Sequence, residues 1–214
     1  KDLQYRINAA GATCLITDSA NAHKINEVSG DCPTLKAKLL IDGSLDTWID
    51  YAKAVGGASD QFETVDTRHD DEAMCYFTSG TTGYPKMTMH SHSYAIGHQT
   101  TGKFWLDLKP EDLHWNISDT GWAKAAWSSY FGPWNCGAAL FVHFTSGFNA
   151  KQTLQLLQEH PVTTMCGAPT IYRMLVLEDL EQYKFANLRH AVGAGEPLNP
   201  EIIETWLKAT GITI

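Results

Sequence analysis

Apolar and polar positions follow two rhythms along the chain, and these predict strands and helices in regular succession. Short apolar runs predict strands at residues 12–17, 39–41, 73–77, 114–117, 138–144, 162–165 and 188–192. Helix-like stretches and their boundary residues predict helices at residues 1–11, 18–28, 46–55, 91–105 and 122–131. A further helix is predicted through Leu154 and Leu157 and ends before Pro161, and two more begin at Pro169 and Pro200. Such alternation favours an α/β fold with largely parallel sheets.

Capping residues sharpen several of these boundaries. Asp18 or Ser19 can cap the helix that follows the first strand, and Asn199 can cap the last helix, with Pro200 in its first turn. Glu201 then stands where a carboxylate suits the positive end of the helix dipole. Residues 56–71 are polar, charged and contain glycine, so we expect a linker there.

The two ends of the chain predict that it is a piece of a longer protein. Its first residues, 1–11, read as the last turns of a helix, and its final residues, 210–214, read as the opening of a strand. An apolar content of 43% is sufficient for a sizeable core. The net charge of −8 argues against binding to a nucleic-acid backbone. No apolar run is long enough to span a bilayer, and no secretory or transit pattern opens the chain. We therefore expect a cytoplasmic protein, with the mitochondrial matrix as the alternative.

Cysteine and histidine usage indicates neither a disulfide framework nor a structural zinc site. The five cysteines are scattered, include no CxxC pair, and are mostly expected to fill apolar surroundings in the core. His90 and His92 would share one face of a strand, as a metal pair needs, but no third ligand is identifiable. We expect His90 to pack beside the loop that precedes it.

Residues 76–86 carry the strongest chemical signal in the chain. This run, YFTSGTTGYPK, follows an apolar strand and precedes the alternating residues Met87 to His90. Its glycines permit tight turning and close approach to a ligand, its hydroxyls donate hydrogen bonds, and Lys86 offers a point charge suited to phosphate. The spacing is not that of the common P-loop, which requires a lysine directly after the second glycine. We interpret the run as a phosphate-binding loop between two strands.

Three further glycine-bearing turns follow predicted strands. The first is residues 118–122, SDTGW, which taken alone predicts a turn with a core tryptophan. The second is residues 166–170, CGAPT, an ordinary strand-to-helix connection when taken alone. The third is residues 193–197, GAGEP, between a strand and a helix, where ligands of parallel sheets tend to bind.

Together these segments resemble the adenylate-forming superfamily, and most of all its medium-chain acyl-CoA synthetases and acetyl-CoA synthetase-like enzymes. The likeness extends to the opening segment, to residues 32–35 and to residues 172–175, and so covers nearly the whole chain. Cys75, where an aliphatic residue is more usual, is a mild departure. The resemblance assigns ATP phosphates to Thr78, Ser79, Gly80, Thr81, Thr82, Gly83, Tyr84, Pro85 and Lys86, the adenine and AMP side to Gly195, Glu196 and Pro197, and the acyl pocket to Trp122 and Gly167.

The resemblance also implies the architecture of the parent protein. It is a large N-terminal domain of layered αβαβα type, present here only in part, followed by a small mobile C-terminal domain that is absent. Residues 1–70 would end its first subdomain, and residues 71–214 would form a truncated subdomain that holds the phosphate loop and binds nucleotide and acyl groups. The magnesium-holding glutamate, the ribose-binding aspartate and the catalytic lysine of the family are expected beyond Ile214.

The implied activity is that of an acid–CoA ligase. A small carboxylic acid attacks ATP to give acyl-AMP and pyrophosphate, CoA then takes the acyl group, and Mg²⁺ assists at the phosphates. Residues 1–214 alone are expected to be inactive and prone to self-association. Two alternatives remain: an adenylation domain with a carrier-protein or other acceptor, and a non-catalytic nucleotide-binding module. The sequence beyond Ile214 would distinguish the first, and the intact mass of the native protein the second.

Overall fold

The computed structural model describes residues 1–78 and 83–214, which form two compact units. The first unit comprises Lys1–His92 and the second Ser93–Ile214. Ser79, Gly80, Thr81 and Thr82, all assigned to ATP phosphates, lie outside the described residues. The antiparallel hairpin that carries the phosphate loop belongs to the first unit. The proposed subdomain boundary between residues 70 and 71 stays a prediction.

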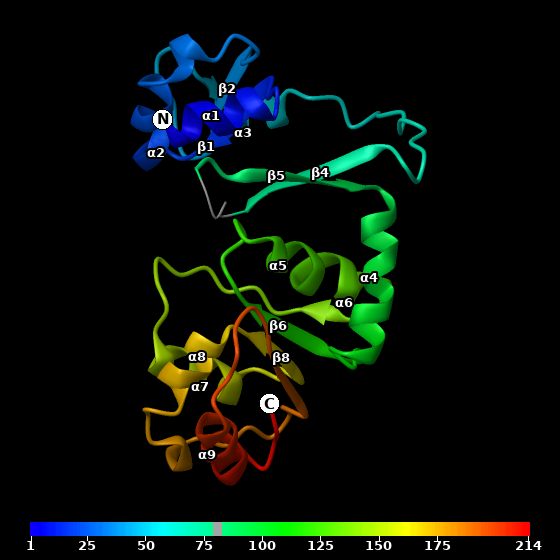
Figure 1. Ribbon diagram of the computed structural model, residues 1–214, viewed down its shortest axis with the longest axis vertical. Coiled ribbons are helices and arrows are strands. Elements are labelled where there is room, and N and C mark those ends of the chain that lie inside the picture. The colour runs from blue at the N-terminus through cyan, green and yellow to red at the C-terminus, as the bar shows by residue number, and fades with distance from the viewer. Residues whose placement is uncertain (79–82) are drawn as a thin grey trace. The chain divides into compact units, whose positions relative to one another are not determined.

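The first unit combines a small parallel sheet with a separate hairpin (Figure 1). Its elements are α1 (Asp2–Ala9), β1 (Cys14–Thr17), α2 (Ser19–Asn26), η1 (Ser29–Asp31), β2 (Ala37–Leu40), β3 (Ile49–Asp50), α3 (Tyr51–Gly56), β4 (Glu72–Thr78) and β5 (Lys86–Ser91). Strands β1, β2 and β3 are parallel, with Ile16 paired to Leu39 and Leu39 to Ile49. The side chain of Asp18 caps α2 by accepting the Asn21 N–H at 2.9 Å, as predicted.

The core of the first unit lies between α1, α2 and one face of this sheet. Its buried residues are Ile7, Ala22, Ile25, Cys32, Leu40 and Trp48. Helix α1 ends before Gly11, whose φ of +58° is a conformation that glycine adopts without cost. This glycine stop, predicted from the sequence, lets the chain turn directly into β1.

The second unit contains a four-stranded parallel sheet in the order β7-β6-β8-β9. Its elements are α4 (Ser93–Phe104), β6 (Leu113–Ile117), α5 (Ala123–Ala126), the π-helix η2 (Trp127–Phe131), α6 (Gly132–Asn135), β7 (Ala139–Leu140), α7 (Ala150–Glu159), β8 (Thr164–Gly167), α8 (Pro169–Leu175), η3 (Leu180–Gln182), β9 (His190–Gly193) and α9 (Pro200–Thr210). All its strand pairs are parallel. Together with the first sheet, this confirms the predicted α/β class with largely parallel sheets.

Helices cover both faces of this sheet, as its apolar strands require (Figure 1). Successive strand residues point to opposite faces, so Met165 packs in one core and Cys166 in the other. The larger core joins the sheet to α7, α8 and α9 through Leu154, Tyr172 and Trp206. The smaller core lies on the opposite face, beside the segment that follows α4. The sheet is therefore a rigid platform whose two ends remain available for loops.

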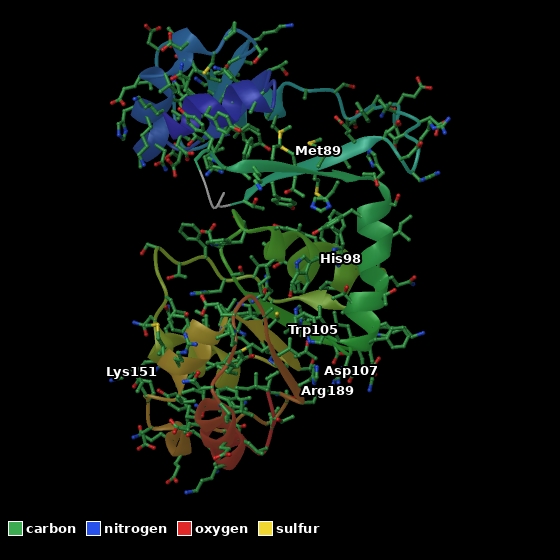
Figure 2. The ribbon with its side chains drawn as sticks, in the orientation of Figure 1. Met89, His98, Trp105, Asp107, Lys151 and Arg189 are labelled. Atoms are coloured by element: carbon green, nitrogen blue, oxygen red, sulfur yellow. The ribbon has the colours of Figure 1, made fainter. Side chains whose placement is uncertain are left out.

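A charged network ties together the amino ends of the strands. Asp112, buried just before β6, accepts hydrogen bonds from Arg189 and from the Thr163 hydroxyl. Arg189 also pairs with Asp107 at 2.5 Å, and Figure 2 shows these two side chains beside each other. Although burial opposes it, the hydrogen bonds from Arg189 and Thr163 hold the pKa of Asp112 below its usual value. This network closes the edge opposite to the glycine-bearing turns.

Two predicted elements are wrong in extent. Residues 46–55 were expected to form one helix, but β3 occupies Ile49–Asp50 and the helix begins only at Tyr51. Ile49 pairs with Leu39 in the sheet, and the Asp50 carboxylate caps the shortened helix at the Lys53 N–H. Residues 138–144 were expected to form a long strand, but β7 pairs with β6 only at two positions. As an edge strand it has a single partner, and the chain leaves the sheet once that pairing ends.

Two smaller expectations also fail. Asn199 has the extended backbone of an N-cap residue, but its side chain makes no capping hydrogen bond. Of the five cysteines, all free, only Cys32 and Cys166 are buried, whereas Cys14 is exposed. The open face of the first sheet explains Cys14, because its alternate neighbour Leu15 takes the position facing the core.

Candidate functional site

Three of the glycine-bearing turns leave the same edge of the four-stranded sheet. Ile117 ends β6 and pairs with Gly167 at the end of β8, which in turn pairs with Gly193 at the end of β9. The turns SDTGW, GAPT and GAGEP therefore begin at neighbouring register positions. Gly167 and Gly193 lie 50 and 76 residues after Ile117 in the sequence, yet all three reach one carboxyl edge, where ligands of open α/β sheets tend to bind.

The first turn displays Trp122 on a firmly held backbone. The Asp119 carboxylate accepts the Gly121 N–H at 2.7 Å, and the Asp119 carbonyl accepts the Trp122 N–H at 3.2 Å. On its other side, the Trp122 carbonyl accepts the Ala125 N–H at the start of α5. Yet the Trp122 side chain is 70% exposed. The alternative of a core tryptophan is therefore wrong, and the indole is free to contact a ligand.

Two residues later, Lys124 does the opposite and buries its amine. Its Nζ is buried beside the Cys166 thiol; burial lowers the pKa of the amine, and the interaction with Cys166 acts against that shift. Burial in turn raises the pKa of the Cys166 thiol. A segment that exposes its tryptophan and buries its lysine inverts the ordinary preference of both side chains. Such local inversions tend to mark functional positions.

A polar layer lies between β6 and the helical segment that follows Trp122. His114 contacts the Thr164 hydroxyl through Nδ1 at 2.7 Å and the Ser128 hydroxyl through Nε2 at 3.3 Å. Asn116, two residues along the same strand face, donates to the Ser129 hydroxyl at 2.9 Å. The π-helical turn directs two consecutive serines toward the sheet, which a regular α-helix would not do. Burial lowers the pKa of His114 to about 4, so the imidazole is neutral near pH 7.

The second turn packs tightly against α8. A Cβ at Gly167 would meet the Tyr172 ring at 3.2 Å, so a larger residue would require that ring to move by a few tenths of an ångström. The Tyr172 hydroxyl donates to the Val192 carbonyl at 2.8 Å and thereby links α8 to β9. Gly167 thus allows close packing against α8, in addition to any role in an acyl pocket.

The third turn depends on Gly195 and is held by α8. Gly195 has a φ of +106°, and a Cβ there would meet no other atom within 4 Å, so the backbone conformation alone demands glycine. Arg173 pairs with Glu196 at 3.5 Å and donates to the Pro197 carbonyl at 3.2 Å. A cavity of about 350 Å³ adjoins the turn, with Glu196 and the indole of Trp105 in its lining.

A second cavity of about 410 Å³ opens at the end of β6. It is lined by the strand end with residues 118–120, by the loop of residues 143–149, by the first turn of α7 and by Ile171. Trp115 and Phe148 supply aromatic surface, and Asp119 supplies a carboxylate. No lysine or arginine occurs among the described residues that line it, so the cavity is not suited to phosphate. Neither Trp122 nor Gly167 lines it.

The phosphate loop belongs to the first unit, between β4 and β5. Thr78 and Lys86 pair where β4 and β5 meet the loop, and the Thr78 hydroxyl donates to the Lys86 carbonyl at 3.4 Å. Gly83 has a φ of +98°, as expected for a tight turn, and Lys86 is exposed. The expected strand–loop–strand context is therefore present. His90 lies on β5 with its ring against Tyr76 at 5.8 Å.

Sequence reasoning missed three residues that support these turns. Tyr5 donates its hydroxyl to the Pro85 carbonyl across eighty residues of chain. Arg173 lies within a segment singled out for likeness alone, and its contact with the third turn carries no sequence signal. Lys124 could have been flagged, since a lysine two residues after the indole of a ligand-binding turn is a candidate contact.

Among residues 1–78 and 83–214, no three His, Cys, Asp or Glu side chains group closely enough to hold a metal ion. Within the same described ranges, no helix combines the length and apolar character needed to cross a bilayer.

The second unit is thus an open α/β unit, with a parallel sheet covered on both faces and glycine-bearing turns along the carboxyl edge where ligands of such sheets tend to bind. The whole chain, residues 1–214, matches the model of the AMP-binding enzyme family, and the chain belongs to that family. This confirms the resemblance to adenylate-forming enzymes.

Curated relatives align with the full chain but are much longer. The chain is 47% identical over 216 residues to mouse (Mus musculus) acyl-coenzyme A synthetase ACSM3, mitochondrial, and 44% identical to human (Homo sapiens) ACSM4, mitochondrial. In both alignments all of this chain is covered, and it spans 37% of the relative's length.

Solved structures share the fold. An acyl-CoA synthetase from Brucella canis superposes with a TM-score of 0.89 at 30% identity, covering 99% of this chain and 39% of that chain. The anthranilate CoA ligase AuaEII, solved in complex with anthranoyl-AMP, gives a TM-score of 0.90 over all of this chain and 42% of its own, at 24% identity. The second likeness concerns the fold alone.

Proposed function

We propose that the parent protein is an ATP-dependent, AMP-forming acid–CoA ligase. The observation that carries this proposal is the alignment of three family turns at paired positions on one sheet edge, Ile117, Gly167 and Gly193. The names of the relatives, which are acyl-CoA synthetases, support the same class. The acid would attack the α-phosphate of ATP, a P–O bond would form as pyrophosphate leaves, and the CoA thiolate would then displace AMP from the acyl carbon.

Each turn has a role in this proposal. The exposed ammonium of Lys86 would bind the β- and γ-phosphates, with the backbone near Gly83 as a further donor; the Thr78 hydroxyl could join them by turning away from the Lys86 carbonyl. The third turn, Gly195 to Pro197, would lie along the AMP moiety, beside the cavity that Trp105 lines. Trp122 would supply an apolar wall for the acid, since its indole is exposed on a held backbone. Positioning and charge neutralisation account for most of the catalysis in such reactions.

The proposed reaction also requires magnesium and CoA. From the resemblance to the family, we propose that a protein ligand of magnesium, like the catalytic lysine, comes from residues beyond Ile214. The 410 Å³ cavity is lined by hydroxyl, amide and aromatic groups and by the Asp119 carboxylate, without lysine or arginine among the described residues, which suits the neutral pantetheine chain of CoA rather than a phosphate. The mitochondrial relatives favour the mitochondrial alternative for this protein over the cytoplasmic one.

The test is made on the full-length parent protein. Acid-dependent pyrophosphate release should occur with small carboxylic acids, and mass spectrometry should detect acyl-CoA when CoA is present. Hydroxylamine trapping without CoA should capture the acyl-AMP. Acyl-AMP formation without any acyl-CoA would support the carrier-protein alternative, and ATP binding without pyrophosphate release would support a non-catalytic module.

A further inference from the structure

The last part of the phosphate loop is in contact with a helix eighty residues earlier in the chain. The Tyr5 hydroxyl on α1 donates to the Pro85 carbonyl at 3.1 Å. The Tyr5 ring also stacks on Tyr84, with ring centroids 4.5 Å apart and an interplanar angle of 21°. One side chain thus contacts two consecutive residues directly before Lys86.

Helix α1 is itself well anchored, so this contact is made from a fixed base. Ile7, two residues after Tyr5, is only 6% exposed and belongs to the core of the first unit. The Tyr5 ring meets the edge of Phe77 on β4 at 6.3 Å, and the Arg6 guanidinium lies over the same Phe77 ring at 5.1 Å. Arg6 is in turn paired with Asp2 at 2.9 Å. Helix α1 therefore contacts the hairpin on both sides of the loop.

Residues 83–85 precede the strand pairing of the hairpin, which begins at Lys86 opposite Thr78. Gly83 adopts a positive φ, and Tyr84 and Lys86 are both exposed. A lysine that must meet a phosphate loses affinity if the chain leading to it has to be ordered when the ligand binds. Contacts that order Tyr84 and Pro85 beforehand would remove part of that cost.

We propose that Tyr5 is a positioning residue for ATP, which holds residues 83–86 so that Lys86 is presented to the phosphates. This inference rests on the proposed function, and it assigns to α1 a role that no motif in its own sequence indicates. Tyr5 acts through Pro85 and Tyr84 and does not itself touch the nucleotide in this scheme.

Two substitutions separate the contributions of the ring and the hydroxyl. Tyr5→Phe removes the hydrogen bond to Pro85 and keeps the stacking on Tyr84, whereas Tyr5→Ala removes both. Tyr51→Ala is the matched control, because Tyr51 is also a half-exposed helical tyrosine of the first unit but lies on α3. From ordinary hydrogen-bond and aromatic-pair strengths, we expect the KM for ATP to rise about threefold in Tyr5→Phe and about tenfold in Tyr5→Ala. The KM for acid and for CoA should stay unchanged.

A second measurement does not depend on activity. Trypsin can cleave the Lys86–Met87 bond, and mass spectrometry of the full-length parent protein reports the rate at that bond alone. Cleavage should accelerate in the order wild type, Tyr5→Phe, Tyr5→Ala, with Tyr51→Ala equal to wild type. Unchanged cleavage at Lys86, or an equal loss for all substrates together with a lower Tm, would overturn the proposal. If the parent forms no adenylate, the proposed function fails while the cleavage rates still decide whether Tyr5 holds the loop.

Discussion

Replacing Trp122 by alanine separates a ligand-contacting role from a structural one, because the two roles predict different costs. The side chain is 70% exposed, so roughly 30% of its surface is covered. A tryptophan buries up to about 150–250 Å², so the covered part is about 45–75 Å², worth about 1–2 kcal/mol at about 25 cal/mol per Å². A fully buried tryptophan would instead cost about 3–5 kcal/mol when truncated.

The expected result is therefore a small loss of stability with a large change in acid preference. Urea unfolding of residues 1–214 should show a loss no greater than about 2 kcal/mol. A panel of straight-chain acids with the full-length parent should show an altered chain-length profile and a nearly unchanged KM for ATP. Trp134→Ala is the matched control, since Trp134 is 61% exposed on α6 and should change stability alone. A stability loss above about 3 kcal/mol with an equal loss for every acid would refute the assignment of Trp122 to the acyl pocket.

Four further outcomes are expected. Lys86→Ala should lower kcat/KM for ATP-dependent pyrophosphate release about 10- to 150-fold, which corresponds to the free energy of one charge-assisted hydrogen bond. Unchanged kinetics would contradict the proposed contact between Lys86 and phosphate. The unfolding free energy should fall by roughly 3 kcal/mol between pH 6.5 and about pH 4, because His114 has a pKa of about 4 in the folded protein and is therefore protonated first in the unfolded chain. Urea unfolding measured across this pH range tests the prediction. A His114→Gln variant with the same pH dependence of stability would argue against it. Gly195→Ala should cost about 1–2 kcal/mol from its positive φ, whereas Gly147→Ala, equally free of neighbouring atoms but without positive φ, should cost almost nothing in the same melts. Residues 1–214 alone should release no pyrophosphate, bind ATP weakly in calorimetry and self-associate in light scattering, and steady turnover would show that they carry their own catalytic groups.

Local patterning predicted most of the elements and failed where pairing between distant segments decides the outcome. The glycine stop at Gly11 and the cap at Asp18 depend on backbone conformation and one hydrogen bond within a few residues, so they could be predicted. The strand at Ile49 could not, because it exists only through its pairing with Leu39. An apolar run, such as residues 138–144, likewise becomes a strand only as far as a partner extends.

The candidate site shows the same division. The phosphate loop and the three turns were found from residue types, since tight turns and anion contacts require glycine, hydroxyls and lysine in close succession. The solvent exposure of the individual side chains in these turns could not be predicted from the sequence. Trp122 is exposed and the Lys124 amine is buried, contrary to what their polarity suggests, because coverage depends on which distant segments pack against a residue.

The sequence by itself thus determined the family and the α/β class, and it located the glycine-bearing turns, all of which depend on short stretches of chain. Only the tertiary structure decided that three of those turns begin side by side at Ile117, Gly167 and Gly193, and that Tyr5 contacts the phosphate loop at Pro85. Both results come from contacts between residues that are far apart in the sequence, from 26 positions for Gly167 and Gly193 to 80 for Tyr5 and Pro85. Such contacts depend on strand register and on which core each helix joins, and no local pattern of residues carries that information.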